Sequence, residues 1–281
     1  MTGGAVPEAF CAAVGRDLVV VSGPDSGSFP QSLLSQDLGS LAPGEAVPAL
    51  LLQPRGKLLV DLVARRHGPD EWWCVCEAGF GAVLADGLRR FRIRVKVEIE
   101  ERPVGALAVR GRAADELPGA VAAAGVVAVP ARWGSAPAVD LIGDAAAVDA
   151  VGAALGLPEI GVDLYEAARI EAGVPRMGID LDEDTIPQEA DLDRDAISFT
   201  KGCFIGQELV CRIDSRGHVN RHLRRLRGGS PTVGAAVTAA GREVGSVTSA
   251  AGEVALALVR REVEPGAIVM VDGRESRIES C

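Results

Sequence analysis

Most hydrophobic positions in this chain fall into short runs that end at glycine or proline, which is the pattern of strands joined by turns. The first run is residues 17–22 (DLVVVS), which Gly23 ends. Residues 49–53 and 58–65 predict a hairpin, because the segment PRGK at 54–57 supplies turn residues between them. Further strands are predicted at 104–109, 126–131 and 138–142.

Two segments alternate apolar and polar residues with the period of a half-buried strand, at 71–76 (EWWCVC) and 94–102. In the first, Cys74 and Cys76 share one face. A strand that buries two small thiols explains this pair better than a metal site does. In the second, the inward positions are Val95, Val97 and Ile99.

Helical spacing is rarer, and it predicts helices at residues 79–91, 113–124, 145–155 and 165–172. The apolar stripe of the first comprises Val83, Leu84, Leu88 and Phe91, and Asp144 is expected to cap the third. A short helix carrying Phe29, Leu33 and Leu34 is predicted to begin at a cap formed by Asp25 or Ser26. Because strands and helices do not alternate strictly, the predicted class is α+β.

From Val233 onward the sequence consists of short β-rich runs separated by glycines. The predicted strands are 237–238, 244–248, 254–259 and 268–271. Their spacing predicts a small antiparallel β-barrel or sandwich that forms a separate C-terminal module.

Composition and charge exclude several classes of function. The chain has 281 residues, 48% of them apolar, and a formal net charge of −10, which argues against general binding to nucleic acid or to an anionic membrane. The first 17 residues lack the basic and apolar regions of a signal peptide, and no apolar run is long enough to span a bilayer. Six cysteines without paired C-x-x-C spacing predict free thiols and no metal site. These features together predict a cytoplasmic protein.

Two segments carry opposite charge. Residues 180–195 hold eight acidic residues and one arginine, whereas residues 212–227 hold six arginines, His218 and His222 against one acid, Asp214. Each segment could be a solvated surface. The basic one is also a plausible seat for an anionic ligand on this acidic protein.

The segment FTKGCFIGQE at 199–208 concentrates residue types that the chain uses sparingly. Lys201 is one of three lysines against twenty-six arginines, and Cys203 lies two residues after it. A compact ammonium beside a thiol can lower the pKa of that thiol, so this pair is a candidate reactive centre. A packed, inert cysteine is the alternative interpretation.

Two carboxylates are further candidates. Asp61 interrupts the apolar strand at 58–65, either on a solvated face or in a cleft where it serves proton transfer or binds a cationic edge. Glu171 falls in the last turn of the helix at 165–172, at the negative end of the helix dipole. It either pairs with Arg169 or Arg176, or accepts two hydrogen bonds from a flat guanidine-like edge such as a pterin.

The blocks RIEAGVPRMGID (169–180), TIPQEA (185–190) and KGCFIGQE (201–208), in that order, resemble the YgfZ/GcvT folate-binding family. The third block is similar to the pattern of its YgfZ branch of tRNA-modifying and iron–sulfur cluster assembly and repair proteins. Residues 19–38 and 50–66 resemble the family's opening, and GSVTSAA at 245–251 resembles its C-terminal barrel. The similarity therefore covers nearly the whole chain.

The resemblance implies a three-part, GcvT-like α+β architecture with mixed and antiparallel sheets and a small antiparallel barrel. Its parts would be an interleaved first folate-binding domain (1–48 with 137–225), a second α+β domain (49–136) and the barrel (226–281). It implies tetrahydrofolate, or a one-carbon-substituted derivative, as the cofactor. The implied partners are that folate and iron–sulfur client proteins, with no direct nucleic-acid or membrane contact.

The resemblance also assigns site residues. Asp61 would be a catalytic or folate-orienting carboxylate, Cys203 a thiolate nucleophile or transient ligand, and Lys201 the cation that activates it. Cys203 would lie beside the folate cleft. The residues implied in binding the cofactor are Glu171, Arg169, Arg212, Arg221, Gln207 and Glu208. Metal ligands are not implied.

Three functions stay open at this point. The first is a folate-dependent factor for assembly or repair of iron–sulfur proteins, which the lysine–cysteine block favours. The second is a tetrahydrofolate-dependent aminomethyltransferase of the glycine-cleavage type, which would make the protein an enzyme. That branch carries paired aspartates where this chain has Val60-Asp61. The third is a non-catalytic folate-binding scaffold.

Overall fold

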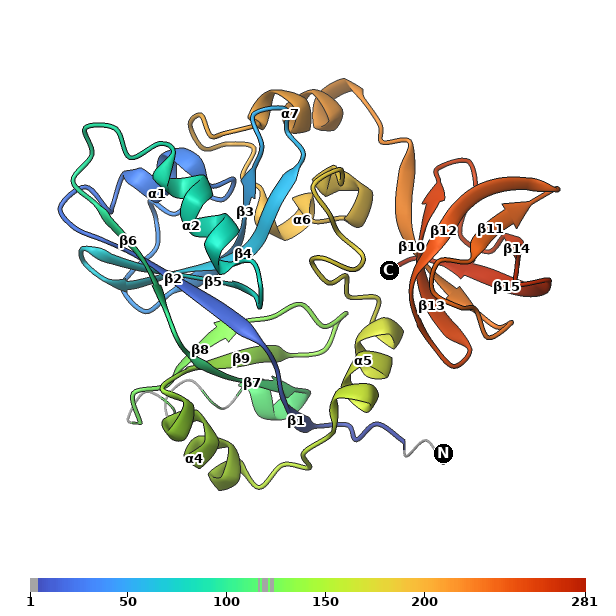
Figure 1. Cartoon of the computed structure of the whole chain (residues 1–281), viewed down its shortest axis with the longest axis horizontal. Helices are drawn as coiled ribbons and strands as arrows, with labels where there is room; N and C mark the ends of the chain where they lie inside the picture. The colour runs from blue at the N-terminus through green and yellow to red at the C-terminus, as the bar shows by residue number, and fades with distance from the viewer. Residues whose placement is uncertain (1–4, 116, 118–120, 122–123) are drawn as a thin grey trace.

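The computed structural model describes residues 5–115, 117, 121 and 124–281. Its strands form two open antiparallel sheets and one closed barrel. Figure 1 shows the two open sheets side by side, with the barrel beyond helix α5 at the C-terminal end of the chain. The predicted α+β class and the C-terminal barrel are confirmed.

The larger open sheet has five strands. In spatial order these are β3 (Ala46–Leu52), β4 (Leu58–Gly68), β5 (Glu71–Glu77), β2 (Arg16–Ser22) and β6 (Glu98–Arg102). The predicted hairpin is confirmed, because Ala49 pairs with Leu62 and Leu50 with Asp61 across β3 and β4. Helices α1 (Phe29–Leu33) and α2 (Gly81–Arg89) pack on this sheet over one apolar cluster, in which Cys74 and Cys76 are buried.

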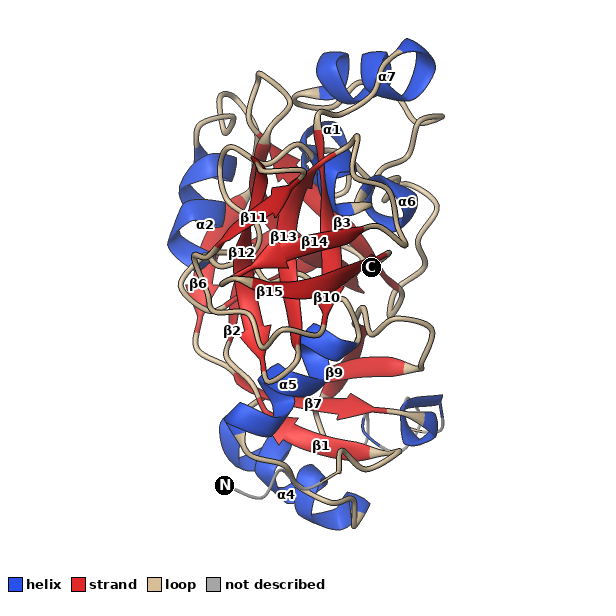
Figure 2. Ribbon diagram, turned by 90° about the vertical axis from the view of Figure 1, so that its right-hand side faces the viewer, coloured by secondary structure: helices blue, strands red, loops and turns tan. Residues whose placement is uncertain are grey.

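The smaller sheet has the order β1 (Phe10–Ala13), β7 (Gly105–Arg110), β9 (Ala138–Gly143) and β8 (Val127–Pro130). Helix α4 (Ala145–Leu155) covers it, and the predicted cap is confirmed: Asp144 Oδ1 accepts the backbone N–H groups of Ala146 and Ala147. Helix α5 (Val162–Glu171) lies between this sheet and the barrel (Figures 1 and 2). Of the predicted helix at 113–124, a 3₁₀ turn (Arg112–Asp115) is observed, and most of the rest lies outside the described residues.

The barrel closes in the order β10 (Arg221–Arg227), β13 (Val254–Arg260), β12 (Arg242–Ala251), β11 (Ala236–Ala239), β14 (Ile268–Val271) and β15 (Arg274–Glu279). The connection from α5 to the barrel carries a 3₁₀ turn (Pro187–Ala190), α6 (Asp193–Ala196) and α7 (Gln207–Arg216). In Figure 2, α7 and α4 lie at opposite ends of the molecule.

Several predictions from the hydrophobic pattern were wrong. Of the predicted apolar stripe, Leu84 and Leu88 are buried in the core, whereas Val83 and Phe91 are exposed. Val83 lies on the outer face of α2, and Phe91 follows the end of the helix at Arg89. Residues 94–97 are not part of strand β6. Helix α1 begins after Ser28 without a side-chain cap, so neither Asp25 nor Ser26 caps it. Strands β1, β10 and β15 were not predicted.

The missed strand β10 explains part of the arginine-rich segment. Leu223 and Leu226 are buried in or beside the barrel, while the arginines between them stay half-exposed. A pattern dominated by charge therefore concealed a strand with two inward positions. The division of the chain into 1–48 with 137–225, 49–136 and 226–281 stays a prediction.

Candidate functional site

A cavity of about 540 Å³ opens between the two open sheets and α5. Its walls come from the β1–β2 turn, β4, β5, the ends of β8 and β9, α5 and the loop at 174–179. Five arginines and four carboxylates line it: Arg16, Arg110, Arg132, Arg169 and Arg176, with Asp61, Glu77, Asp140 and Glu166. The lining is thus slightly basic, in a chain whose net charge is −10.

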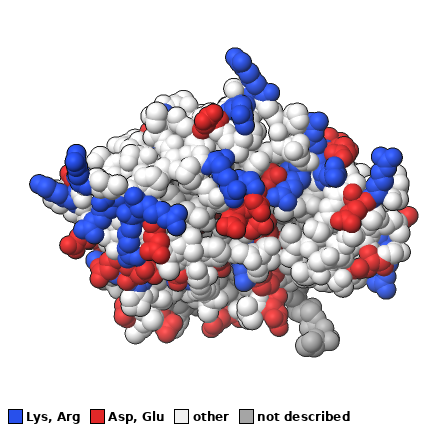
Figure 3. All heavy atoms as spheres, turned by 45° about the horizontal axis from the view of Figure 1, so that its top comes forward, with Lys and Arg blue, Asp and Glu red and all other residues white. Residues whose placement is uncertain are grey.

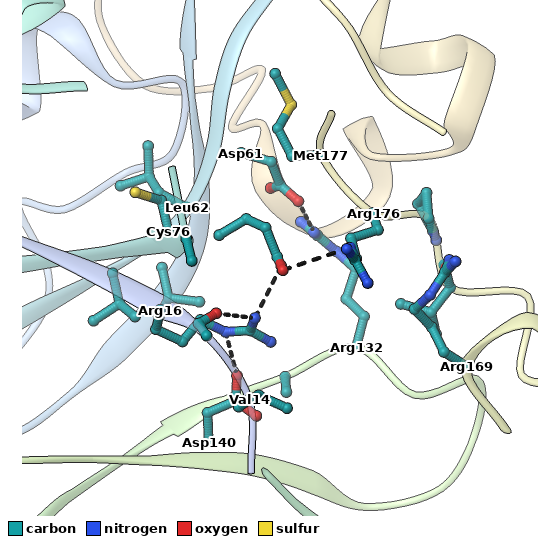
Figure 4. A pocket seen from close by; sticks show the side chains of 18 of the residues that line it. Val14, Arg16, Asp61, Leu62, Cys76, Arg132, Asp140, Arg169, Arg176 and Met177 are labelled. Atoms are coloured by element: carbon teal, nitrogen blue, oxygen red, sulfur yellow. Dashed lines mark hydrogen bonds and ion pairs between the residues drawn. The ribbon is translucent and has the colours of Figure 1, made fainter. Parts of the chain in front are cut away.

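Asp61 projects from β4 into this cavity (Figure 4). Its Oδ2 accepts a hydrogen bond from Arg132 Nη1 at 2.7 Å, and Arg132 also binds Asp195 through two nitrogens. The other oxygen, Oδ1, is buried and has no hydrogen-bond partner in the protein. Burial raises the pKa of Asp61 in spite of the Arg132 guanidinium. Asp61 therefore carries a buried acceptor without a hydrogen-bond partner in the wall of the cavity.

The floor of the cavity is a network of buried charges. Asp140 accepts Arg16 Nε on one oxygen and Arg110 Nη2 on the other, both at 2.8 Å. Burial alone would raise the pKa of Asp140, but these two arginines hold it below its usual value. Arg16 also binds Glu77 at 2.9 Å, and Arg110 donates to the Tyr165 hydroxyl. These contacts fix the guanidinium groups in place before any ligand arrives.

Arg169, a predicted cofactor-binding residue, lines the cavity but its donors are largely used within the protein. It binds Asp180 at 2.8 Å, the carbonyl of Val174 at 2.6 Å and Ser249 Oγ at 3.0 Å. Asp180 is buried and also accepts the Ser249 hydroxyl. This network joins α5 to barrel strand β12, so its clearest role is to hold the cavity wall against the barrel.

The lining matches the chemistry of a folate. The acceptor Asp61 Oδ1 and the donor Arg110 Nε have no hydrogen-bond partner. The Nε of Arg176 makes no hydrogen bond but lies 3.7 Å from Glu77 Oε1. A flat heterocycle with N–H donors and ring acceptors satisfies both kinds, and apolar walls from Leu62, Val75 and Met177 cover its faces. The residues present therefore fit the cofactor that the sequence predicted.

Lys201 lies elsewhere, beneath the loop that precedes α7. Its ammonium donates to three backbone carbonyls around the end of α1, those of Gln31 at 2.6 Å, Leu34 at 2.7 Å and Gln36 at 2.9 Å. Burial lowers the pKa of Lys201 to about 8. An ammonium has three donors, so none is left for the thiol of Cys203. The structure thus gives Lys201 an anchoring contact in place of the predicted activating one.

Cys203 is exposed and is not among the residues that line the cavity, so its role beside a folate stays a prediction. Its neighbours in the motif are structural. The Gln207 side chain accepts the backbone N–H of Phe204 at 3.0 Å. Gly206 has φ 77° and lies so close to the β3–β4 turn that a Cβ atom there would meet the carbonyl of Gln53. Glu208 is exposed in the first turn of α7.

The remaining predicted residues also lie outside the cavity lining. Glu171 is half-exposed and pairs with Arg227 of β10, so neither Arg169 nor Arg176 is its partner. Arg221 binds Glu189 at 2.9 Å, and Arg212 is exposed on α7. The structure therefore brings Asp61 and Arg169 to one cavity, and leaves the other predicted residues on separate surfaces.

Sequence reasoning missed Arg16, Glu77 and Arg132, which define the cavity's charge. Each occupies the end of a strand or the turn after one, where a charged residue normally reads as solvent-exposed. Opposite charges at the ends of several predicted strands are the only sequence signal for such a network. Among the described residues there is no cluster of three or more metal-ligating side chains, and no helix long and apolar enough to cross a membrane.

Comparison with known proteins now defines the class. The chain superposes on the crystal structure of the glycine cleavage system aminomethyltransferase T from Bartonella henselae with a TM-score of 0.81. That match covers 97% of this chain and 85% of the other at 22% identity, so it shows a shared fold. Residues 222–277 match the model of the CAF17 C-terminal beta-barrel domain. The protein therefore has the GcvT-like fold with the C-terminal barrel.

Sequence relatives define the family. The human mitochondrial iron–sulfur cluster assembly factor IBA57 is 31% identical over 280 residues, covering 88% of this chain and 76% of the relative. An aminomethyltransferase of Mycobacterium leprae is 28% identical, covering 92% and 80%. The tRNA-modifying protein YgfZ of Blochmanniella pennsylvanica is 47% identical over 60 residues, 21% of this chain and 18% of that protein. The chain belongs to the IBA57 family of iron–sulfur cluster assembly factors, which is related to YgfZ and to GcvT.

Proposed function

We propose that this protein binds tetrahydrofolate, or a one-carbon derivative of it, in the cavity and assists the assembly or repair of iron–sulfur proteins. The observation that carries the folate part is the unpartnered Oδ1 of Asp61 inside a slightly basic, partly apolar cavity. A buried acceptor without a partner costs about 1–3 kcal/mol, which a ligand N–H would recover.

The residues have distinct tasks in this proposal. Asp61 binds the donor edge of the ring, and Arg132 fixes the carboxylate by holding its other oxygen. Arg110 offers its Nε, which has no hydrogen-bond partner, to an acceptor on the ligand, and Arg176 offers an Nε that is only loosely paired with Glu77. A bound tetrahydrofolate would supply a nitrogen that carries a one-carbon unit. The packed floor of the cavity would exclude water from the side of the folate ring that faces it.

Cys203 serves the second part of the proposal, as the thiol that meets a partner's iron–sulfur centre. It lies on the surface, where a protein partner can reach it, and outside the cavity, where a small folate would bind. Membership in the IBA57 family supports this division of labour. Lys201 and Gly206 support the loop and leave the thiol as its one exposed nucleophile.

An aminomethyltransferase is the second candidate, because Asp61 faces the cavity with a raised pKa and so suits proton transfer. The Mycobacterium leprae relative bears that name. Arg132 weakens this candidate, since its direct ion pair favours the ionised carboxylate as a fixed acceptor. Formation of methylene-tetrahydrofolate from an aminomethyl-lipoyl carrier would establish it.

Calorimetry with tetrahydrofolate tests the first part. We expect the wild type to bind, and Asp61→Asn to weaken binding at least tenfold, which is about 1.4 kcal/mol. An exposed carboxylate with no role in the cavity, in the variant Glu253→Gln, is the matched control. Failure of the wild type to bind overturns the folate assignment.

The second part is tested in cells. We expect Cys203→Ala to lower the activity of iron–sulfur enzymes while tetrahydrofolate still binds the purified variant. Cys211→Ala, on the adjacent α7, is the control thiol. Unchanged iron–sulfur enzyme activity in the Cys203 variant would instead favour a packed cysteine and a folate-binding scaffold. Fractionation of the same cells checks the proposed cytoplasmic location.

A further inference from the structure

The connection between α2 and β6, residues 90–97, is an exposed basic and apolar segment on an acidic protein. Among the described residues, no acidic side chain lies within salt-bridge distance of its four cations, Arg90, Arg92, Arg94 and Lys96. Two apolar side chains alternate with them, Phe91 at 41% exposure and Ile93 at 75%. In Figure 3, basic side chains gather at the left end of the face, where Figure 1 places this connection.

The segment is also strained at one residue. Arg94 has φ 61°, in the left-handed region where a side chain other than glycine is disfavoured. The protein retains an arginine at this position although glycine would relax the backbone. Asp191, Ser230, Ala240 and Asp272 also have positive φ, so the strain by itself marks no site. It does allow a variant, Arg94→Gly, that removes this charge while relaxing the backbone.

Helix α1 connects this segment to the Cys203 loop. At its start, the Lys96 N–H donates to Asp25 Oδ2 at 2.7 Å. At its end, Lys201 binds the carbonyls described above. Figure 1 shows the two connections on the same side of the molecule, next to α1. Small uncharged residues are exposed between them: Gly27, Ser28 and Ser32.

We propose that these three surfaces form one docking face, here named the α1 face: residues 90–96, the small residues of and before α1, and the Cys203 loop with Phe199. Its occupant is an acidic iron–sulfur protein that has an apolar recess for Ile93. This inference rests on the proposed function, because it names the surface that binds the partner whose iron–sulfur cluster meets Cys203. The five residues of α1 span about 7.5 Å, whereas a standard interface buries about 800 Å² on each side. An interface of that size can contact both ends of this helix, so we place a single partner on both.

Charge complementarity favours a protein over a longer polyanion. Immediately after the basic segment, β6 exposes Glu98, Glu100 and Glu101. A nucleic acid or an anionic membrane extending past residues 90–96 would meet these carboxylates. A protein with a local acidic patch avoids them, and uncompensated arginines beside an aromatic residue are typical of interface anchors.

The test uses the full-length protein with a photo-crosslinking amino acid at position 93, 199 or 268 in cells, so that the Cys203 thiol stays in place. Phe199 of the Cys203 loop is 38% exposed, and Ile268 of the barrel is an exposed apolar control at 51% exposure. We expect positions 93 and 199 to trap the same acidic iron–sulfur protein, and position 268 not to trap it. Different proteins at 93 and 199, a partner without an iron–sulfur site, or trapped lipid or nucleic acid would each overturn the proposal.

Charge reversal provides the second arm. We expect Arg90→Glu/Arg92→Glu/Arg94→Glu to lower trapping at position 199 at least tenfold, because like charges slow the encounter. The matched control reverses three exposed barrel arginines without an ion pair among the described residues: Arg242, Arg274 and Arg277. Equal trapping by both triple variants would overturn the proposal.

The single variant Arg94→Gly tests whether the loss of trapping in the triple variant comes from unfolding. It relaxes the left-handed backbone, so we expect a melting temperature equal to or above wild type, together with at least threefold weaker trapping. A stable variant with full trapping counts against the docking face. If Cys203→Ala abolishes iron–sulfur enzyme activity while the basic-segment variants leave it intact, the docking face fails and the proposed function survives.

Discussion

The cavity and the Cys203 loop use charged side chains in opposite ways. In the cavity, arginines and carboxylates bind one another but leave three polar atoms of Asp61, Arg110 and Arg176 without hydrogen-bond partners. In the loop, every donor of Lys201 is used on backbone carbonyls. The first region therefore has unused capacity for a ligand, and the second uses its charge to hold a surface loop.

This difference changes how the lysine–cysteine block should be interpreted. The block resembles a reactive pair in sequence, but its lysine and its second glycine fix the loop to α1 and to the β3–β4 turn. The thiol of Cys203, by contrast, is exposed. Four experiments test this difference between the two regions.

The largest effect is expected from Arg132→Met, which leaves the Asp61 carboxylate buried without its counter-ion. Breaking such a pair costs about 3 kcal/mol of unfolding free energy. The double variant Arg132→Met/Asp61→Leu should recover at least half of that loss, since it removes the unpaired charge. Denaturant titration measures both, and a loss below about 1 kcal/mol for the single variant would show that water already solvates Asp61.

Lys201→Met should cost about 2 kcal/mol, because it leaves carbonyls around the end of α1 without donors. Lys201→Arg should lose less unfolding free energy, because the guanidinium keeps the positive charge and several donors. It should still lose some, because a planar group cannot reach three carbonyls with the same geometry. Cys203→Ser serves as the control, with an unfolding free energy within about 0.5 kcal/mol of wild type. Similar stability of Lys201→Met and wild type would return Lys201 to an activating role.

The Lys201 contact also predicts a pH dependence. Burial lowers the pKa of Lys201 in the folded protein to about 8, against 10.5 for a free lysine, so between these values the unfolded chain holds the proton more often. The free energy of unfolding should therefore rise with pH in that window, by about 1–2 kcal/mol relative to Lys201→Met. Denaturant titrations of both proteins at pH 7, 8.5 and 10 measure this difference. Parallel curves would mean that Lys201 titrates normally.

The smallest effect is expected from Glu171→Ala. Its carboxylate pairs with Arg227 at a half-exposed position, and such pairs contribute less than about 1 kcal/mol. Because Glu171 does not line the cavity, tetrahydrofolate affinity should stay within about twofold of wild type. The family resemblance predicts a large loss instead. Calorimetry on this variant beside Asp61→Asn decides between the two placements.

The sequence determined the α+β class, the β3–β4 hairpin, the capped helix after Asp144 and the C-terminal barrel. These features depend on local turn chemistry and short-range periodicity, which one stretch of chain carries by itself. It also identified Asp61, because a carboxylate in an apolar strand is conspicuous. The family was recognisable from three blocks of residues in fixed order.

Only the tertiary structure decided which charges meet. Arg132 and Asp61 are 71 residues apart, and Lys201 reaches carbonyls more than 160 residues before it. Side chains at such separations have no periodicity that links them, so the cavity's network and the anchoring of Lys201 were invisible in the pattern. Likewise, whether a glutamate in the last turn of α5 faces the cavity or the barrel depends on how that helix packs. The chain specifies its elements locally, and the packing of those elements assigns each charge its partner.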